Sequence, residues 1–319
     1  MKKFYDKLIQ TRHYLHRHPE LSGQEYQTTI FLKNYLEDLE IRILDSNLKT
    51  GLIAEIGSGQ PIIALRADID ALPIFEQTNL SYASQNPGVM HACGHDFHQT
   101  SLLGAAELLK AMEEDLRGTI RLIFQPAEET SCGALEVIET GYLDDVKAIV
   151  GFHNMPQLKA NQLALKPGAM MAGVEKFKVD VEGISSHAAR PDLGVDTVIT
   201  LTSMVQALQV LVARTVSPFE ANVLSITHIE AGTTWNVLPQ NGFFEGTIRS
   251  FSPSSQKKLK EDFAFYQEKI PGVFAFVGSN GADDVPDLHH DTMTIDDEAF
   301  KVSVPYYVES ALCLLKCYK

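Results

Sequence analysis

The chain has 319 residues, of which 45% are hydrophobic and 21% are charged, and its formal net charge is −14. This is the composition of an ordinary globular protein that is long enough for two domains. The negative charge argues against a nucleic-acid or anionic-membrane partner, because either would require a basic face. No stretch approaches the ~18 apolar residues of a membrane span. Four cysteines are too few for a disulfide framework in a chain of this size, so we expect a reduced, cytoplasmic protein.

The first half of the chain alternates predicted helices with apolar strands. Helices are predicted at 4–18, 26–39, 99–112 and 133–140. Strands are predicted at 51–56, 61–67, 119–124 and 148–152. The strand at 61–67 is nearly all apolar, which is typical of a strand that is buried on both faces. This alternation predicts an α/β fold with a mainly parallel sheet and helices on both of its faces.

The pattern changes after residue 168. Three strands that alternate apolar and polar residues are predicted at 176–181, 222–229 and 241–250. One long apolar helix is predicted between the first two, at 196–215. A half-exposed sheet with one helix is a small α+β domain. We place this inserted domain at 169–260, and the larger, discontinuous domain at 1–168 and 261–319, where a strand at 273–278 and a helix at 296–315 are expected.

Side chains that can bind a metal follow several predicted strands. The segment 90–100, MHACGHDFHQT, holds Cys93 and three of the eleven histidines. Cys93 and His95 are two residues apart, so an extended backbone would direct both to one face. Similar candidates occur farther along the chain, namely Glu128, Glu129, His153, His289 and His290. Because the ends of parallel strands meet at a ligand crevice, these residues together indicate a site for divalent ions.

Each candidate also has a less specific interpretation. Two adjacent glutamates are often a solvated pair, a histidine after a buried strand is often part of the core, and two adjacent histidines are often on the surface. On an extended backbone, however, Glu128 and Glu129 would point in opposite directions, so that one could bind metal while the other acts as a general base. Cys93 as a nucleophile is a further alternative, but a thiolate among histidines and carboxylates is better explained as a ligand.

Five motifs together resemble the di-metal amidohydrolases of the aminoacylase/carboxypeptidase superfamily. The branch is the one that contains hippurate hydrolases, N-acetyldiaminopimelate deacetylases and auxin-conjugate hydrolases. The motifs occur in the expected order over nearly the whole chain, as RADIDALP at 66–73, HACGHD at 91–96, QPAEE at 125–129, SHAA at 186–189 and GTIR at 246–249.

The resemblance implies two divalent metal ions per subunit, Zn, Mn, Co or Ni. It implies five metal ligands, which are Cys93, His95, Glu129, His153 and His289. Glu128 is then the general base, and His187 is a second catalytic residue that stabilises the oxyanion in the partner subunit's site. Asn236 and Arg249 are expected to bind the carboxylate of the substrate. Arg66 stands where other branches have a metal-binding histidine, so Asp68 is expected to support the site without binding metal.

The implied reaction is metal-dependent hydrolysis of the amide bond of N-acyl amino acids, for example N-acetyl amino acids, which releases a carboxylate and a free amino acid. The alternatives are a dipeptidase or metallocarboxypeptidase, and a degenerate binding protein without activity. The expected partners are a small N-acyl amino acid or dipeptide and a second copy of the chain, because the inserted domain is expected to act as a lid and as the surface of a homodimer.

The sequence departs from the family pattern at one junction. Where the lid of the family continues through further strands and helices, Lys260 here runs directly into Glu261. Either the lid is shortened, in which case the dimer contact and the reach of His187 would be affected, or the sequence omits a segment at this junction.

Overall fold

The computed structural model describes the chain except for residues 168–172, 216–221, 251–261, 282–284 and 319. The chain divides into two compact units. The larger unit comprises Met1–Met170 and Asp262–Lys319, and the smaller unit comprises Met171–Glu261. The predicted domain junctions, and with them the junction at Lys260–Glu261, lie outside the described residues.

The larger unit contains a seven-stranded sheet in the order β1-β2-β4-β3-β5-β12-β6. Its four central strands pair in parallel and are β4 (Thr119–Gln125), β3 (Ile62–Asp68), β5 (Val146–Lys159) and β12 (Gly272–Asn280). The antiparallel strands at the edges are β1 (Arg42–Leu44), β2 (Leu52–Gly57) and β6 (Leu163–Ala164). Every residue of β3 and β4 is buried, as expected for strands that are covered on both faces.

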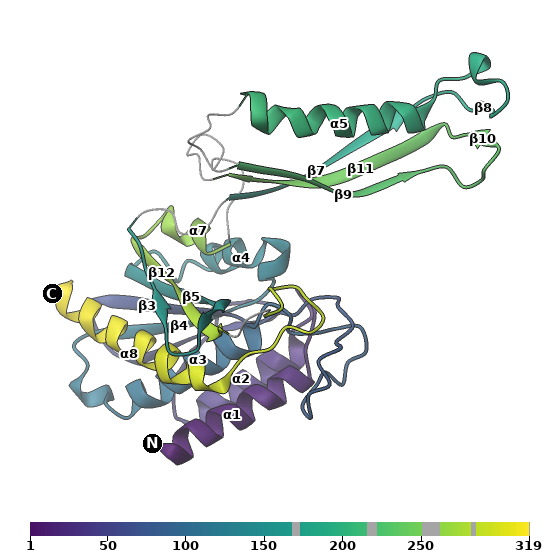
Figure 1. Cartoon of the computed structure of the whole chain (residues 1–319). Coiled ribbons are helices and arrows are strands. Elements are labelled where there is room, and N and C mark those ends of the chain that lie inside the picture. The colour runs from purple at the N-terminus through teal and green to yellow at the C-terminus, as the bar shows by residue number, and fades with distance from the viewer. Residues whose placement is uncertain (168–172, 216–221, 251–261, 282–284, 319) are drawn as a thin grey trace. The chain divides into compact units, whose positions relative to one another are not determined.

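Helices cover both faces of this sheet (Figure 1). One face carries α1 (Lys2–Arg17), α2 (Tyr26–Asp38), α3 (His95–Lys110) and α8 (Phe300–Cys317). The other face carries α4 (Gly133–Glu139) and α7 (Asp262–Gln267). Phe97 of α3 packs against Phe152 of β5 and Phe300 of α8, with ring centroids 5.6 Å and 5.0 Å apart. The predicted α/β fold with a mainly parallel sheet is confirmed.

Two local predictions were wrong, and both concern the backbone near the metal-binding residues. The segment before α3 is not extended: Gly94 has a left-handed conformation with φ of 88°, and the helix begins at His95 rather than at residue 99. The adjacent glutamates are not extended either, because they lie in a short 3-10 helix, η2 (Glu128–Thr130). Tight turns, rather than alternation along a strand, therefore direct these side chains.

The smaller unit is a three-stranded antiparallel sheet in the order β7-β11-β9, with one helix packed on it. Its elements are β7 (Gly173–Glu182), α5 (Thr197–Thr215), β9 (Asn222–Ala231) and β11 (Asn241–Ser250). Leu201 of α5 and Phe244 of β11 are fully buried between the two layers. A second pair of short strands, β8 (Ser186–His187) and β10 (Val237–Leu238), extends from this sheet. Across the described residues of both units, no helix is long and apolar enough to cross a bilayer.

Buried charges attach the N-terminal helix to the core of the larger unit. Arg12 and His16, one turn apart on α1, both contact the carboxylate of Asp96, through Nη1 at 3.3 Å and Nδ1 at 3.0 Å. Arg12 also donates through Nε to Asp297 at 2.7 Å, and Nε2 of His16 lies 3.2 Å from Glu76. Burial alone would lower the pKa of His16, but the Asp96 and Glu76 carboxylates outweigh burial and raise it to about 9.

This pKa predicts a pH-dependent contribution of His16 to stability. Because the folded-state pKa lies above the value of about 6.5 in an unfolded chain, protonated His16 stabilises the fold fully below that pH, and the contribution is lost as the pH rises through about 9. Between these two limits the native protein should lose up to about 3 kcal/mol of unfolding free energy that a His16→Asn variant does not lose. Urea unfolding over this pH range measures the difference, and parallel curves for the two proteins would contradict it.

Candidate metal centre

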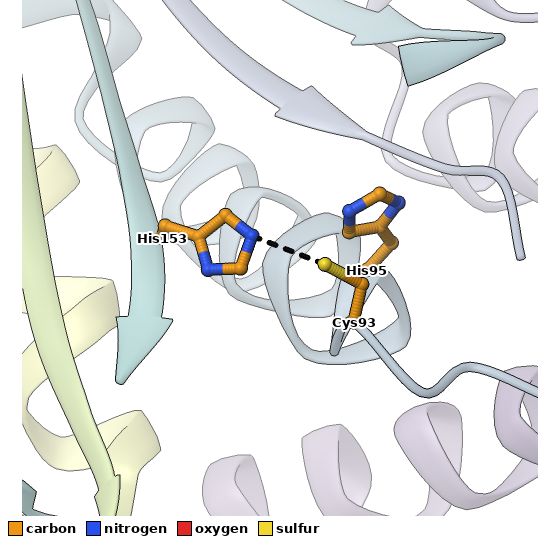
Figure 2. A group of neighbouring side chains, drawn as sticks. All are labelled: Cys93, His95 and His153. Atoms are coloured by element: carbon orange, nitrogen blue, oxygen red, sulfur yellow. Dashed lines mark hydrogen bonds between the residues drawn. The ribbon is translucent and has the colours of Figure 1, made fainter. Parts of the chain in front are cut away.

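A buried thiol lies among imidazole groups beside the parallel sheet. Cys93 precedes α3, His95 is the first residue of that helix, and His153 lies on β5. All three side chains are almost fully buried. Figure 2 shows the Cys93 side chain directed toward the ring of His153, with His95 beside it, and the Sγ atom is 3.3 Å from Nε2 of His153.

Glu129 and His289 approach the same thiol from two other loops. Nε2 of His289 lies 3.3 Å from Sγ of Cys93 and 3.6 Å from Oε1 of Glu129. The backbone amide of His289 donates to the carbonyl oxygen of Ala92 at 2.9 Å, which holds this segment next to Cys93. His289 itself has a left-handed backbone with φ of 63°, so a local turn directs its ring.

The structure thus brings all five predicted metal ligands together. Their donor atoms form two groups, each with its atoms within 4.8 Å of one another, which are Cys93–His95–His153 and Cys93–Glu129–His289. Cys93 belongs to both groups. A thiolate at this position can therefore serve two neighbouring cations, provided that it is deprotonated.

Both adjacent glutamates face the free nitrogen of His95. Oε2 of Glu128 and Oε1 of Glu129 each lie 3.9 Å from Nε2 of His95. In the described part of the chain, Nε2 of His95 and Oε1 of Glu129 are buried without a hydrogen-bond partner. A buried polar atom without a partner is costly, and native proteins generally satisfy it. The donor set around these atoms therefore fits a bound cation.

Hydrogen bonds at the opposite ring nitrogens orient two of the histidines. Nδ1 of His95 is 2.9 Å from the carbonyl oxygen of Asp70, and Nδ1 of His153 is 2.8 Å from that of Asn154. A carbonyl oxygen only accepts, so each Nδ1 carries the proton and donates it. In the neutral rings the lone pair of Nε2 then faces the cluster, as a metal ligand requires.

The electrostatics of the cluster also favour a cation. Burial raises the pKa of the Cys93 thiol well above its ordinary value, and the carboxylates of Glu129 and Glu128 raise it further. Burial alone would lower the pKa of His95, but neighbouring carboxylates, with Asp68 the largest contributor, raise it to about 10. A divalent cation reverses both tendencies, because it stabilises the thiolate and displaces the proton from imidazole.

Asp68 lies next to the cluster, but its oxygen atoms are already occupied. Oδ2 accepts from Nη1 of the buried Arg66 at 2.6 Å, and Oδ1 accepts from Nδ1 of His98 at 2.6 Å. Asp68, His95 and His98 are also close enough to form a metal-binding group. Because the guanidinium already neutralises the carboxylate, we interpret Asp68 as support for the site.

A second polar network fixes the strand that leads to the glutamates. Gln125, the last residue of β4, accepts from Nε of Arg66 and from the hydroxyl of Tyr266, each at 2.8 Å. Its amide group donates to Asp262, whose carboxylate also accepts the backbone amide of Ala134 at 2.9 Å. The start of α7 is therefore hydrogen-bonded to the residues on both sides of the segment 127–133 that carries Glu128 and Glu129, which we call the glutamate loop. The sequence analysis did not identify this role, because pairing between residues so far apart has no local signal.

Two of the three predicted residues of the smaller unit lie close together. His187 on β8 is exposed and pairs with Val237 on β10, next to Asn236. The amide of Ala188 donates to the carbonyl oxygen of Asn236 at 3.1 Å. Arg249 is at the opposite end of β11 from the residues that follow β10. Within the smaller unit, Arg249 is therefore not brought together with His187 and Asn236.

A buried cluster of thiol, imidazole and carboxylate groups at strand ends, with a further carboxylate beside it, is the arrangement of a metal-dependent hydrolase. Comparison with known proteins identifies the family. The model of peptidase family M20/M25/M40 matches residues 64–312. The chain belongs to this family, which confirms the resemblance drawn from the five motifs.

Individual relatives cover the chain well. The N-acetylcysteine deacetylase of Bacillus subtilis (strain 168) is 39% identical over 380 residues, which cover 100% of this chain and 99% of that protein. The N-acyl-L-amino acid amidohydrolase of Geobacillus stearothermophilus is 39% identical over 257 residues, or 80% of this chain and 70% of that protein. A solved Bacillus subtilis structure, described as a dinuclear metal binding peptidase from the M20 family, has a TM-score of 0.81 and 37% identity and covers 99% of each chain.

The alignment lengths bear on the predicted shortening. The first of these alignments extends over 380 residues, whereas this chain has 319. The Bacillus subtilis relative therefore has about 60 residues that find no counterpart in this chain.

The turn at Gly94 generates a prediction about the site. A Cβ atom there would lie 2.5 Å from Oδ1 of Asn154, in addition to the strain of a left-handed backbone with φ of 88°. Gly94→Ala should therefore lower the unfolding free energy by roughly 2 to 4 kcal/mol. Gly88→Ala is the matched control, because Gly88 also has positive φ, at 81°, but a Cβ would meet nothing within 4 Å. That variant should lose only about 1 kcal/mol. Equal losses in chemical denaturation would contradict the proposed contact.

Proposed function

We propose that this chain hydrolyses the amide bond of N-acyl amino acids with the help of two divalent metal ions, Zn, Mn, Co or Ni. The observation that carries the proposal is the Cys93 thiol shared by two ligand groups, with the Glu128 carboxylate beside them. The names of two relatives, a deacetylase of N-acetylcysteine and an amidohydrolase of N-acyl amino acids, support the substrate class. The dinuclear centre named for the Bacillus subtilis structure supports two ions.

The two groups divide the ligands between the ions. One ion would be held by Cys93, His95 and His153, and the other by Cys93, Glu129 and His289. When bound, such ions polarise an amide carbonyl and lower the pKa of a coordinated water from 15.7 to about 7, so that no serine or cysteine nucleophile is needed.

Glu128 handles the proton in this proposal. Glu129 belongs to the second ligand group, and His95, Glu128 and Glu129 form a further group of donor atoms within 4.8 Å of one another. We assign the proton transfer to Glu128 because, unlike Glu129, it is not grouped with the Cys93 thiol. Its carboxylate accepts the proton of the attacking water and passes it to the nitrogen of the leaving amine. The water oxygen forms the new bond to the acyl carbon and the C–N bond breaks. The products are the carboxylate of the acyl group and the free amino acid.

Two variants test the separate roles of Glu128 as the base and Cys93 as a metal ligand. Glu128→Gln should keep about two metal ions per chain but lower kcat by about 10²- to 10⁴-fold, because it removes only the proton acceptor. Cys93→Ala should lose metal from both groups and activity with it. Elemental analysis gives the metal content, and amine release from a panel of N-acetyl amino acids and dipeptides gives the activity and separates a deacylase from a dipeptidase.

The outcomes of this test differ clearly. Full activity of Glu128→Gln would contradict its role as the base. Full metal content of Cys93→Ala would contradict the shared thiol. A native protein that binds metal but hydrolyses neither class of compound would favour a binding protein without activity.

We further propose that the smaller unit is a lid that pairs with a second copy of the chain. Arg249 lies eight residues beyond Asn241 along β11, which corresponds to about 26 Å of strand. One smaller unit does not bring the backbone position of Arg249 together with His187 and Asn236 at the other end of β11. Two copies can do so: His187 stabilises the oxyanion in the partner subunit's site, while Asn236 and Arg249 from different copies bind the carboxylate.

The four free cysteines support a reducing, cytoplasmic location.

Complementation between two inactive variants tests the exchange of His187 between subunits. Glu128→Gln has an intact His187, and His187→Ala has an intact Glu128. Mixed dimers should therefore contain one complete site in two, so an equal mixture should recover about a quarter of the native activity. Sedimentation equilibrium establishes the dimer independently. A dimer without recovery would place His187 in the site of its own subunit, and a monomer would remove the exchange altogether.

A further inference from the structure

A fully buried carboxylate outside the metal centre contacts the loop that carries Glu128. Glu25 immediately precedes α2, but its side chain does not cap that helix. Instead, Oε1 accepts the backbone amide of Ala127 at 2.8 Å, and Oε2 accepts the hydroxyl of Thr50 at 2.8 Å. Three segments that are far apart in the sequence therefore meet at one carboxylate.

The residue that receives this support has an unfavourable backbone. Ala127 has φ of 51° and ψ of 39°, in the left-handed region that residues with a Cβ avoid. Such a conformation persists only where surrounding contacts hold it. The hydrogen bond from the Ala127 amide to the Glu25 side chain is such a contact, and it acts on the residue directly before Glu128.

Ala127 is also the point at which the loop closes. Its carbonyl oxygen accepts the amide of Gly133 and the hydroxyl of Thr130, each at 3.2 Å. Gly133 cannot be replaced without displacement, because a Cβ there would lie 1.6 Å from the carbonyl oxygen of Pro126. Residues 127–133 therefore form a loop that closes on the carbonyl oxygen of Ala127.

The two glutamates have different supports within this loop. The amide of Glu129 donates to Oδ2 of Asp70 at 3.0 Å, and the same Asp70 also contacts His95. Glu129 is thus tied directly to the ligand cluster. Glu128, in contrast, directly follows the backbone that Glu25 holds.

We propose that Glu25 is a positioning residue for Glu128. By holding Ala127 in its left-handed turn, the buried carboxylate directs the Glu128 side chain toward the water and the leaving amine. This inference rests on the role of Glu128 as the base. The position of a catalytic group matters strongly, since a displacement of about 1 Å can cost about 10²-fold in rate.

Glu25→Ala and Glu25→Gln test the proposal through kinetics. Glu25→Ala should lower kcat by about 10- to 100-fold while KM and metal content stay near the native values, because the ligand groups keep their own supports. Glu25→Gln keeps an oxygen that can accept the Ala127 amide and should retain most of the activity. Combined with Glu128→Gln, Glu25→Ala should cause no further loss of kcat, because it acts through the side chain that is already disabled.

Hydrogen exchange provides a readout that does not depend on activity. Peptides that cover residues 125–133 should exchange faster in Glu25→Ala than in the native protein. Glu55→Gln is the matched control: Glu55 is also a buried carboxylate, but it pairs with Arg121. It should lower stability and leave kcat and the exchange of the loop unchanged.

The failures of the two proposals can be told apart. Unchanged hydrogen exchange of residues 125–133 in Glu25→Ala would overturn the positioning role. So would a Glu25→Ala substitution that lowers kcat by the same factor in the native protein and in Glu128→Gln. If Glu25→Ala does not fold, Glu25→Asp replaces it, because this variant keeps the carboxyl group but shortens the side chain. A native kcat together with native hydrogen exchange of residues 125–133 in Glu25→Asp would also overturn the positioning role. A native protein without amidase activity would refute the proposed function, while the exchange experiment would still decide the contact.

Discussion

The sharing of one thiol by two ligand groups is the interaction on which the rest of the site depends. Cys93 lies within hydrogen-bonding distance of two imidazoles that come from β5 and from the loop before η4 (Asp297–Ala299). In the absence of a cation, burial and the nearby carboxylates oppose ionisation of this thiol. The thiolate and the bound cations therefore stabilise each other, and the surrounding protein only has to hold the donors in place.

The way in which the donors are held also explains the buried charges of the larger unit. The Asp70 carboxylate connects His95 to the Glu129 backbone, and Arg66 neutralises Asp68 while it binds Gln125 at the start of the glutamate loop. Each of these groups would be costly to bury alone. Paired, they fix the orientation of the ligands before any metal binds, which is the condition for a precise site.

Much of this arrangement can be read from the sequence, and the parts that cannot have physical reasons. Apolar strands followed by polar side chains predict both the parallel sheet and the region where the ligands meet. The local backbone was predicted wrongly at Gly94 and at Glu128, where distant segments lie close to the turns: a Cβ on Gly94 would meet Asn154, and the amide of Ala127 donates to Glu25. Glu25 and Asp262 were not recognised as supports, since each acts across more than 100 residues of sequence.

The candidate ligands and their supports all lie in one of the two units. All five candidate ligands, together with Glu25 and Asp262, belong to the larger unit. Asp262 is the first residue described after the junction at Lys260–Glu261, and it already binds Gln125 and the backbone of Ala134. The chain that returns from the smaller unit is therefore engaged with the glutamate loop from its first described residue. In the described part of the chain, the contacts that hold the metal centre all come from the larger unit.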